Sequence, residues 1–143
     1  MTARYFVDTN LLVYVFGSRV AAGQDPRRDR AQELLLGKPC VSVQVLNEFV
    51  DVCRRKVKLT WNEIKGYLEV IEELCYSAIP VSYEVHRSAL EISIRHELRI
   101  YDSLIIAAAL EAGCDILYSE DMQHGQLIEG VRIENPFLSS GTL

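Results

Sequence analysis

The sequence predicts an α/β fold, in which helices pack on both sides of a central parallel sheet. Short apolar runs that are typical of buried strands alternate with longer segments whose apolar residues recur at helical spacing. The chain has 143 residues, 49% of them hydrophobic, which suits one domain with a sizeable core. We therefore expect a single domain over residues 1–143, with its core between about residues 4 and 135.

The N-terminal part of the chain predicts one strand and two helices. Tyr5, Phe6 and Val7 form an apolar run, and a short helix-like segment follows them. A polar stretch with Gly and Pro then leads to a second helix, which Gly37 and Pro39 end. The expected elements are a strand over 4–7, a helix over 10–16, a loop over 18–26 and a helix over 27–36.

The middle of the chain predicts two short strands and three helices. Residues 40–43 have the composition of a buried strand, and the helix after them keeps its apolar spacing as far as Val57. Thr60 and Glu63 have the spacing of a capping box, which starts the next helix. A strand over 78–81 follows, and Ser82 is placed to cap the third helix.

The C-terminal part predicts one more helix and two more strands. Asp102 begins a helix over 103–112 that is apolar on nearly every side, so we expect it to be buried against the sheet. Gly113 ends this helix. The remaining segments are a strand over 115–118, an edge strand over 131–133 and a loosely held tail over 137–143.

The composition argues against several classes of protein. The longest apolar runs, such as 104–110, are far shorter than a membrane span, and the N-terminus lacks the features of a signal peptide. The four cysteines have neither metal-binding nor redox spacing, and the three histidines include no i,i+4 zinc pair. We expect reduced, buried cysteines, no zinc site, and a cytoplasmic location without membrane contact.

Four acids, Asp8, Glu48, Asp102 and Asp121, stand at the ends of strand-like runs or near the starts of helix-like ones. The carboxyl ends of parallel strands share one edge of a sheet, so residues far apart in sequence converge there. Carboxylates held close together repel one another unless a cation lies among them. The pattern therefore predicts a divalent metal site.

Each acid also has a purely structural explanation. Asp8 stands where Asp commonly caps a helix, and Asp102 stands where an acid interacts favourably with a helix dipole. Glu48 lies in an apolar segment and is either a ligand or a residue of the solvent-exposed side of its helix. Glu120 is an alternative ligand to Asp121, although alternation along the chain favours Asp121.

The basic residues form two groups, and these bear on a nucleic-acid partner. The net charge is −5, but the residues outside the four acids carry only −1. The groups are either solvated helix surfaces or tracks for a phosphate backbone. The candidates for RNA contact are Arg27, Arg28 and Arg30 in one group and Arg54 and Arg55, within the run that extends to Lys58, in the other. Trp61, Tyr67 and Tyr101 are possible platforms for a base.

In these acids and their neighbours, the chain resembles the PIN-domain family of metal-dependent ribonucleases, and in size and layout the VapC-type toxins of bacterial toxin–antitoxin pairs. The resemblance rests on Asp8-Thr9-Asn10-Leu11-Leu12, Asn47-Glu48, Tyr101-Asp102-Ser103-Leu104-Ile105 and Ser119-Glu120-Asp121-Met122. It implies a Rossmann-like α/β/α sandwich, Mg²⁺ or Mn²⁺ among the carboxylates, and an RNA substrate. It also implies a homodimer, and a small antitoxin that inhibits the protein by inserting into its groove.

The residues allow a mechanism in which water attacks an RNA phosphodiester. Asp8 and Asp102 would contact the metal directly, and Asp121 would complete the site directly or through water. Glu48 would hold or deprotonate the attacking water, so the products would carry a 5′-phosphate and a 3′-hydroxyl. The supporting residues would be Thr9, Asn10 and Ser119, which orient water or hydrogen-bond the ligands.

Three other interpretations remain open at the level of sequence. A PIN nuclease of RNA processing that is not a toxin has the same acids. A catalytically silent module that binds RNA or protein has no need of all four. An aspartate-based phosphohydrolase of Rossmann-like fold would have a second Asp where this chain has Asn10, and a Lys near the last strand, which is missing.

Overall fold

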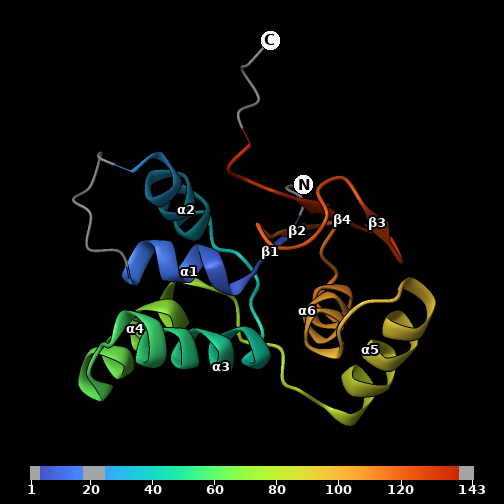
Figure 1. The fold of residues 1–143 in the computed structure, drawn as a ribbon, viewed down its shortest axis with the longest axis horizontal. Helices are drawn as coiled ribbons and strands as arrows, with labels where there is room; N and C mark the ends of the chain where they lie inside the picture. The colour runs from blue at the N-terminus through green and yellow to red at the C-terminus, as the bar shows by residue number, and fades with distance from the viewer. Residues whose placement is uncertain (1–3, 18–24, 139–143) are drawn as a thin grey trace.

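The computed structural model describes residues 4–17 and 25–138 (Figure 1). Residues 18–24 of the predicted loop and 139–143 of the predicted tail lie outside this part of the chain. The elements, in chain order, are β1 (Tyr5–Val7), α1 (Thr9–Phe16), α2 (Pro26–Leu36), α3 (Val43–Val52), the π-helix η1 (Cys53–Val57), α4 (Trp61–Leu74), α5 (Tyr83–His96), α6 (Ile100–Glu111), β2 (Ile116–Tyr118), β3 (Leu127–Ile128) and β4 (Val131–Glu134).

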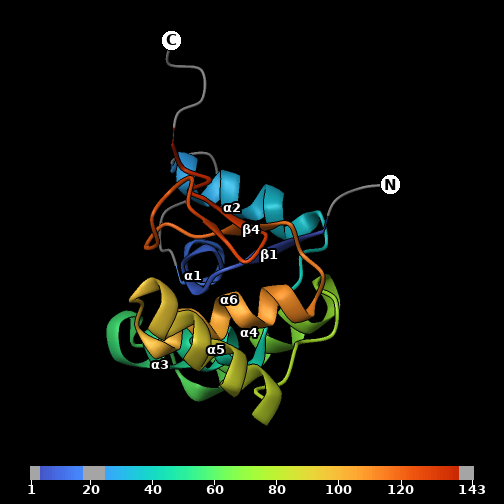
Figure 2. The same cartoon turned by 90° about the vertical axis from the view of Figure 1, so that its right-hand side faces the viewer.

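The sheet has the strand order β1-β2-β4-β3. The first three strands in this order run parallel, and β3 pairs with β4 in the antiparallel direction. Figure 2 shows α2 on one side of the sheet and α6 with α5, α3 and α4 on the other. The predicted α/β class, with helices on both sides of a mainly parallel sheet, is therefore confirmed.

The prediction that residues 131–133 form an edge strand is wrong. These residues belong to β4, which lies between β2 and β3, so the edge on this side is β3. Glu129 and Gly130 both have positive φ, 50° and 95°, as the tight turn of a hairpin requires. This turn brings Leu127 and Ile128 back against β4 and covers it.

The two short strands predicted in the middle of the chain are reduced to isolated bridges. Cys40 pairs with Phe6, and Ile79 pairs with Ser42. The Ser42 side chain accepts a hydrogen bond from the Val45 N–H, so it caps α3, and Val43 is already helical. The extended segment therefore ends one residue earlier than the sequence suggests.

Helix starts differ from the predictions by one to three residues because of their caps. Asp8 caps α1 at Thr9, and Asp25 caps α2, whose first residue is Pro26 rather than part of the loop. Arg99 is the N-cap of α6, so Asp102 lies within its first turn instead of at its start. The capping box at Thr60 is confirmed.

The core lies where the helices meet the sheet. Phe6 and Leu117 come from adjacent strands, Phe49 from α3 and Ile105 from α6, and all of them are buried. The prediction that α6 is buried is confirmed, because every residue from 103 to 109 is inaccessible to solvent. All four cysteines are buried free thiols. In the described part of the chain, no helix is long and apolar enough to cross a membrane.

Candidate functional site

The carboxyl ends of β1 and β2 place two polar residues side by side. Asp8 follows β1 and Ser119 follows β2, its parallel neighbour. The Asp8 N–H donates to the Tyr118 carbonyl oxygen at 3.0 Å, which continues the ladder by one residue. This is the sheet edge at which ligands bind in open α/β folds.

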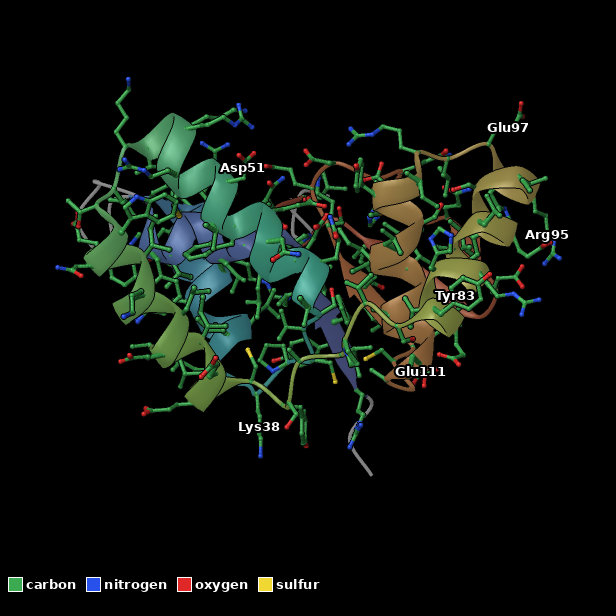
Figure 3. The ribbon with its side chains drawn as sticks, turned by 90° about the horizontal axis from the view of Figure 1, so that it is seen from below. Lys38, Asp51, Tyr83, Arg95, Glu97 and Glu111 are labelled. Carbon is green, nitrogen blue, oxygen red and sulfur yellow. The ribbon has the colours of Figure 1, made fainter. Side chains whose placement is uncertain are left out.

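A cleft of about 680 Å³ opens beside this edge. The four predicted acids, Asp8, Glu48, Asp102 and Asp121, all line it, although more than a hundred positions separate the first from the last. The other lining residues are Thr9, Asn10, Gln44, Asp51, Val52, Arg55, Lys56, Arg99 and Tyr101. In Figure 3, α3 with Asp51 lies on one side and α6 on the other. The structure therefore brings the acids together, and their roles as ligands remain a prediction.

Asp8 is the most buried acid of the cleft, with 5% of its surface exposed. Its Oδ1 accepts from the Thr9 N–H at 2.7 Å, and its Oδ2 accepts from the Ser119 hydroxyl at 2.7 Å. Burial raises the pKa of Asp8 from 3.8 to about 6, an effect that the two hydrogen bonds oppose and the charges of Glu48 and Asp121 reinforce. Its negative charge is therefore costly in this site.

Polar amides hold two of the other acids. Asn10 Nδ2 donates to Asp121 Oδ2 at 2.8 Å, which links α1 to the turn after β2. Gln44 Nε2 donates to Glu48 Oε2 at 2.9 Å within α3, at i,i+4 spacing. Asn10 was predicted as a supporting residue, whereas Gln44 was missed, although its spacing from Glu48 is the signal that could have identified it.

Asp102 has no such amide partner among the described residues. Burial raises its pKa, the charge of Arg99 lowers it, and the charge of Asp121 raises it further. Asp8, Asp102 and Asp121 therefore influence one another electrostatically within one cleft.

Glu120 points away from the cleft. The Tyr14 hydroxyl donates to Glu120 Oε1 at 2.8 Å, and Arg27 Nη1 lies 4.0 Å from its Oε2. The three consecutive residues 119–121 thus contact three different residues, namely Asp8, Tyr14 and Asn10. This arrangement agrees with the preference for Asp121 over Glu120 in the cleft.

The predicted basic residues divide between different surfaces. Of the five RNA-contact candidates, only Arg55 lines the cleft, and it forms a two-pronged ion pair with Asp51, at 2.7 Å for the closest atoms. Arg27, Arg28 and Arg30 are on α2, where Arg27 contacts Tyr14 and Arg30 contacts Glu33 and the Tyr118 ring. Arg54 lies over the Trp61 ring.

Two cations that were not candidates, Lys56 and Arg99, do line the cleft. Lys56 was part of the basic run that continues to Lys58, but Arg99 stands alone in the sequence and gave no signal beyond its proximity to Asp102. The cleft thus combines an acidic floor with exposed cations on different elements.

The chemistry of the cleft fits a hard divalent cation. All four acids offer oxygen ligands, and His and Cys are absent from the lining, as Mg²⁺ and Mn²⁺ prefer. Within residues 4–17 and 25–138, no three His, Cys, Asp or Glu side chains approach closely enough to form a complete metal site. Hydrogen bonds to Ser119, Asn10 and Gln44 hold three of the acids in this arrangement, and Asp8, Asp102 and Asp121 are the residues that could hold the ion.

An α/β fold with this acidic cleft at its sheet edge defines the class of the protein. Residues 5–127 match the PIN domain, and the chain belongs to the PIN-domain family. Comparison with curated protein sequences finds no match.

Solved structures with a similar fold come from several toxin–antitoxin systems. The Mycobacterium tuberculosis VapC20 toxin, which cleaves the sarcin–ricin loop, has 21% identity and a TM-score of 0.62 over 82% of this chain and 89% of its own. The VapBC2 complex of Rickettsia felis, bound to a DNA fragment from its promoter, has 19% identity and a TM-score of 0.63 over 91% and 96%. A Klebsiella pneumoniae toxin–antitoxin complex has 16% identity and a TM-score of 0.68 over 94% and 98%.

Proposed function

We propose that this protein is a metal-dependent endoribonuclease that hydrolyses RNA phosphodiester bonds in the cleft between α3 and α6. The observation that carries the proposal is the convergence of Asp8, Glu48, Asp102 and Asp121 on one cleft at the carboxyl edge of the sheet. Membership of the PIN-domain family supports it. A scaffold without chemistry would have no reason to accept the cost of burying Asp8 beside other acids.

The residues divide the work as their surroundings suggest. Asp8 and Asp102 would hold the cation, and Asp121, held by Asn10, would complete its site. Mg²⁺ or Mn²⁺ would supply the positive charge that stabilises the attacking and leaving oxygens of the phosphodiester. Glu48, which has one hydrogen bond from Gln44, would orient the attacking water and take its proton.

Ser119 and Thr9 act through Asp8. The Ser119 hydroxyl and the Thr9 N–H each donate to one oxygen of this carboxylate. Both hydrogen bonds favour the ionised form, which is the form that binds a cation. They also fix the orientation of the carboxylate, because each oxygen has its own donor.

We further propose that the protein is the toxin of a type II toxin–antitoxin pair. The similar folds of VapC20 and of two toxin–antitoxin complexes support this role. The proposal includes a cytoplasmic location, a homodimer, and a small antitoxin that blocks the cleft. Coexpression with the protein encoded beside it tests the role, because a cognate antitoxin would restore growth and copurify with this chain.

Cleavage of a mixed RNA pool tests the nuclease proposal. We expect cutting with Mg²⁺ or Mn²⁺ that EDTA abolishes, and loss of cutting in Asp8→Asn, Glu48→Gln, Asp102→Asn and Asp121→Asn. Glu111→Gln is the matched control, because this exposed acid lies at the far end of α6 from the cleft (Figure 3). Cutting that persists in the four variants would contradict the proposal.

A further inference from the structure

Tyr101 differs from every other tyrosine of the chain. The chain has seven tyrosines, all within the described residues, and the rings of the other six each lie against another ring or a cation. The Tyr101 ring has no such contact with a described residue, and 53% of its surface is exposed. It lines the acidic cleft and directly precedes Asp102.

The other exposed aromatic candidate from the sequence is already occupied. The guanidinium of Arg54 lies 4.7 Å from the centre of the Trp61 ring, and Trp61 is not part of the cleft. The Tyr67 ring packs on Phe16 at 5.1 Å. Of the three possible base platforms, only Tyr101 is both open and beside the acids.

Two cations of the cleft are also unengaged. Arg99, two residues before Tyr101, and Lys56, on η1, are exposed and have no hydrogen bond or ion pair with any described residue. Arg55 provides the contrast, since Asp51 holds its guanidinium through Nε and Nη2. The cleft therefore offers free positive charge from two different elements and one free aromatic ring.

We propose that Tyr101 is the platform on which one unpaired base of the substrate stacks, while Arg99 and Lys56 hold the neighbouring phosphates. This inference rests on the proposed function. A base on Tyr101 lies next to Asp102, and therefore next to the reacting phosphate. Because a paired base is already stacked within its helix, the substrate must present an unpaired nucleotide at the point of cleavage.

Binding measurements in a silent background test the inference without cleavage. The parent protein is the Glu48→Gln variant with Mg²⁺, which keeps the three acids proposed to hold the ion. The probes are a short fluorescein-labelled single-stranded RNA of mixed sequence and a duplex of the same length. We expect the parent to bind the single strand more tightly, and Tyr101→Ala to weaken this binding about 10-fold while leaving duplex binding unchanged.

Two further variants separate stacking from structural damage. Tyr101→Phe keeps the ring and should bind like the parent. Tyr83→Ala removes a tyrosine that is 70% exposed on α5, on the far side of α6 from α3 (Figure 3), and should also bind like the parent. Arg99→Gln should lower the slope of log affinity against log salt by about 0.7, since one phosphate contact is lost.

Three outcomes would overturn the inference. One is equal affinity of the parent and Tyr101→Ala for single-stranded RNA, including the case in which Tyr101→Ala instead loses binding to a protein partner. Another is an equal loss in Tyr101→Phe and Tyr101→Ala, and a third is an equal loss for single strand and duplex. Failure of the proposed function looks different, because the wild type would then cut no RNA and the parent would bind none.

Discussion

Replacing Asp8 by Asn should stabilise the metal-free protein at neutral pH, even though it should abolish cleavage. Asp8 is 5% exposed, and its pKa in the folded protein is about 6 against an ordinary value of 3.8. The raised pKa means that folding favours the protonated acid. This stabilising contribution is fully present below about pH 4 and is lost as the pH rises through about 6.

The magnitude follows from the difference between the two pKa values. About 2 units correspond to about 3 kcal/mol at pH 7, the free-energy cost of ionising Asp8 in the folded protein. Asn avoids this cost, and its Oδ1 can still accept from Thr9 while its amide donates to Ser119 Oγ. Because the hydrogen bonds lose their charge-assisted strength, we expect a net gain of about 1–3 kcal/mol.

Thermal unfolding in EDTA at pH 7 measures this gain. The expected rise in Tm for Asp8→Asn is roughly 3–9 °C, and it should vanish near about pH 4, where wild-type Asp8 is protonated. Asp51→Asn is the control in the same cleft: the ion pair with Arg55 lowers the pKa of Asp51, so its neutralisation should give no stabilisation. A lower Tm for Asp8→Asn than for wild type at pH 7 would refute the reasoning.

Three other substitutions test separate parts of the structure. Ser119→Ala removes a hydrogen bond that lowers the pKa of Asp8, so the acidic limb of the pH–cleavage profile should move to higher pH; an unmoved limb would contradict this. Tyr14→Phe leaves Glu120 without its 2.8 Å donor and should lower the free energy of unfolding, measured in urea, by about 1 kcal/mol. Phe49→Ala removes a fully buried ring and should cost about 3–5 kcal/mol in the same assay; a cost below about 1 kcal/mol would show that the core is placed wrongly.

The convergence of the acids could be predicted because it depends on topology alone. Asp8 and Asp121 follow apolar runs that form neighbouring parallel strands, and the right edge of the sheet is then determined. Glu48 and Asp102 needed only to lie near the starts of helices that follow extended segments. No knowledge of side-chain packing was required, so sequence patterns were sufficient.

The basic surfaces could not be predicted in the same way. Arg54, Arg55 and Lys56 are consecutive, and the sequence gives no reason to separate them. The change from α3 to the π-helix η1 at Cys53 sets their directions, so Arg54 lies over Trp61 while Arg55 and Lys56 line the cleft. The partners of a long flexible side chain depend on such local geometry.

The position of β4 in the sheet was missed for a different reason. Its partner β3 has only two residues, Leu127 and Ile128, which is too short to show the alternation by which strands are identified. The turn at Glu129 and Gly130 was the available signal, since Gly in such a position is typical of tight hairpins.

Analysis of the RNA ends produced by the protein tests the central claim most directly. Water activated at Glu48 beside a cation held by Asp8 and Asp102 leaves a 5′-phosphate and a 3′-hydroxyl. We predict these ends, only with Mg²⁺ or Mn²⁺ present, and none in the Asp8→Asn variant. A 2′,3′-cyclic phosphate, or cleavage that continues in EDTA, would contradict the account.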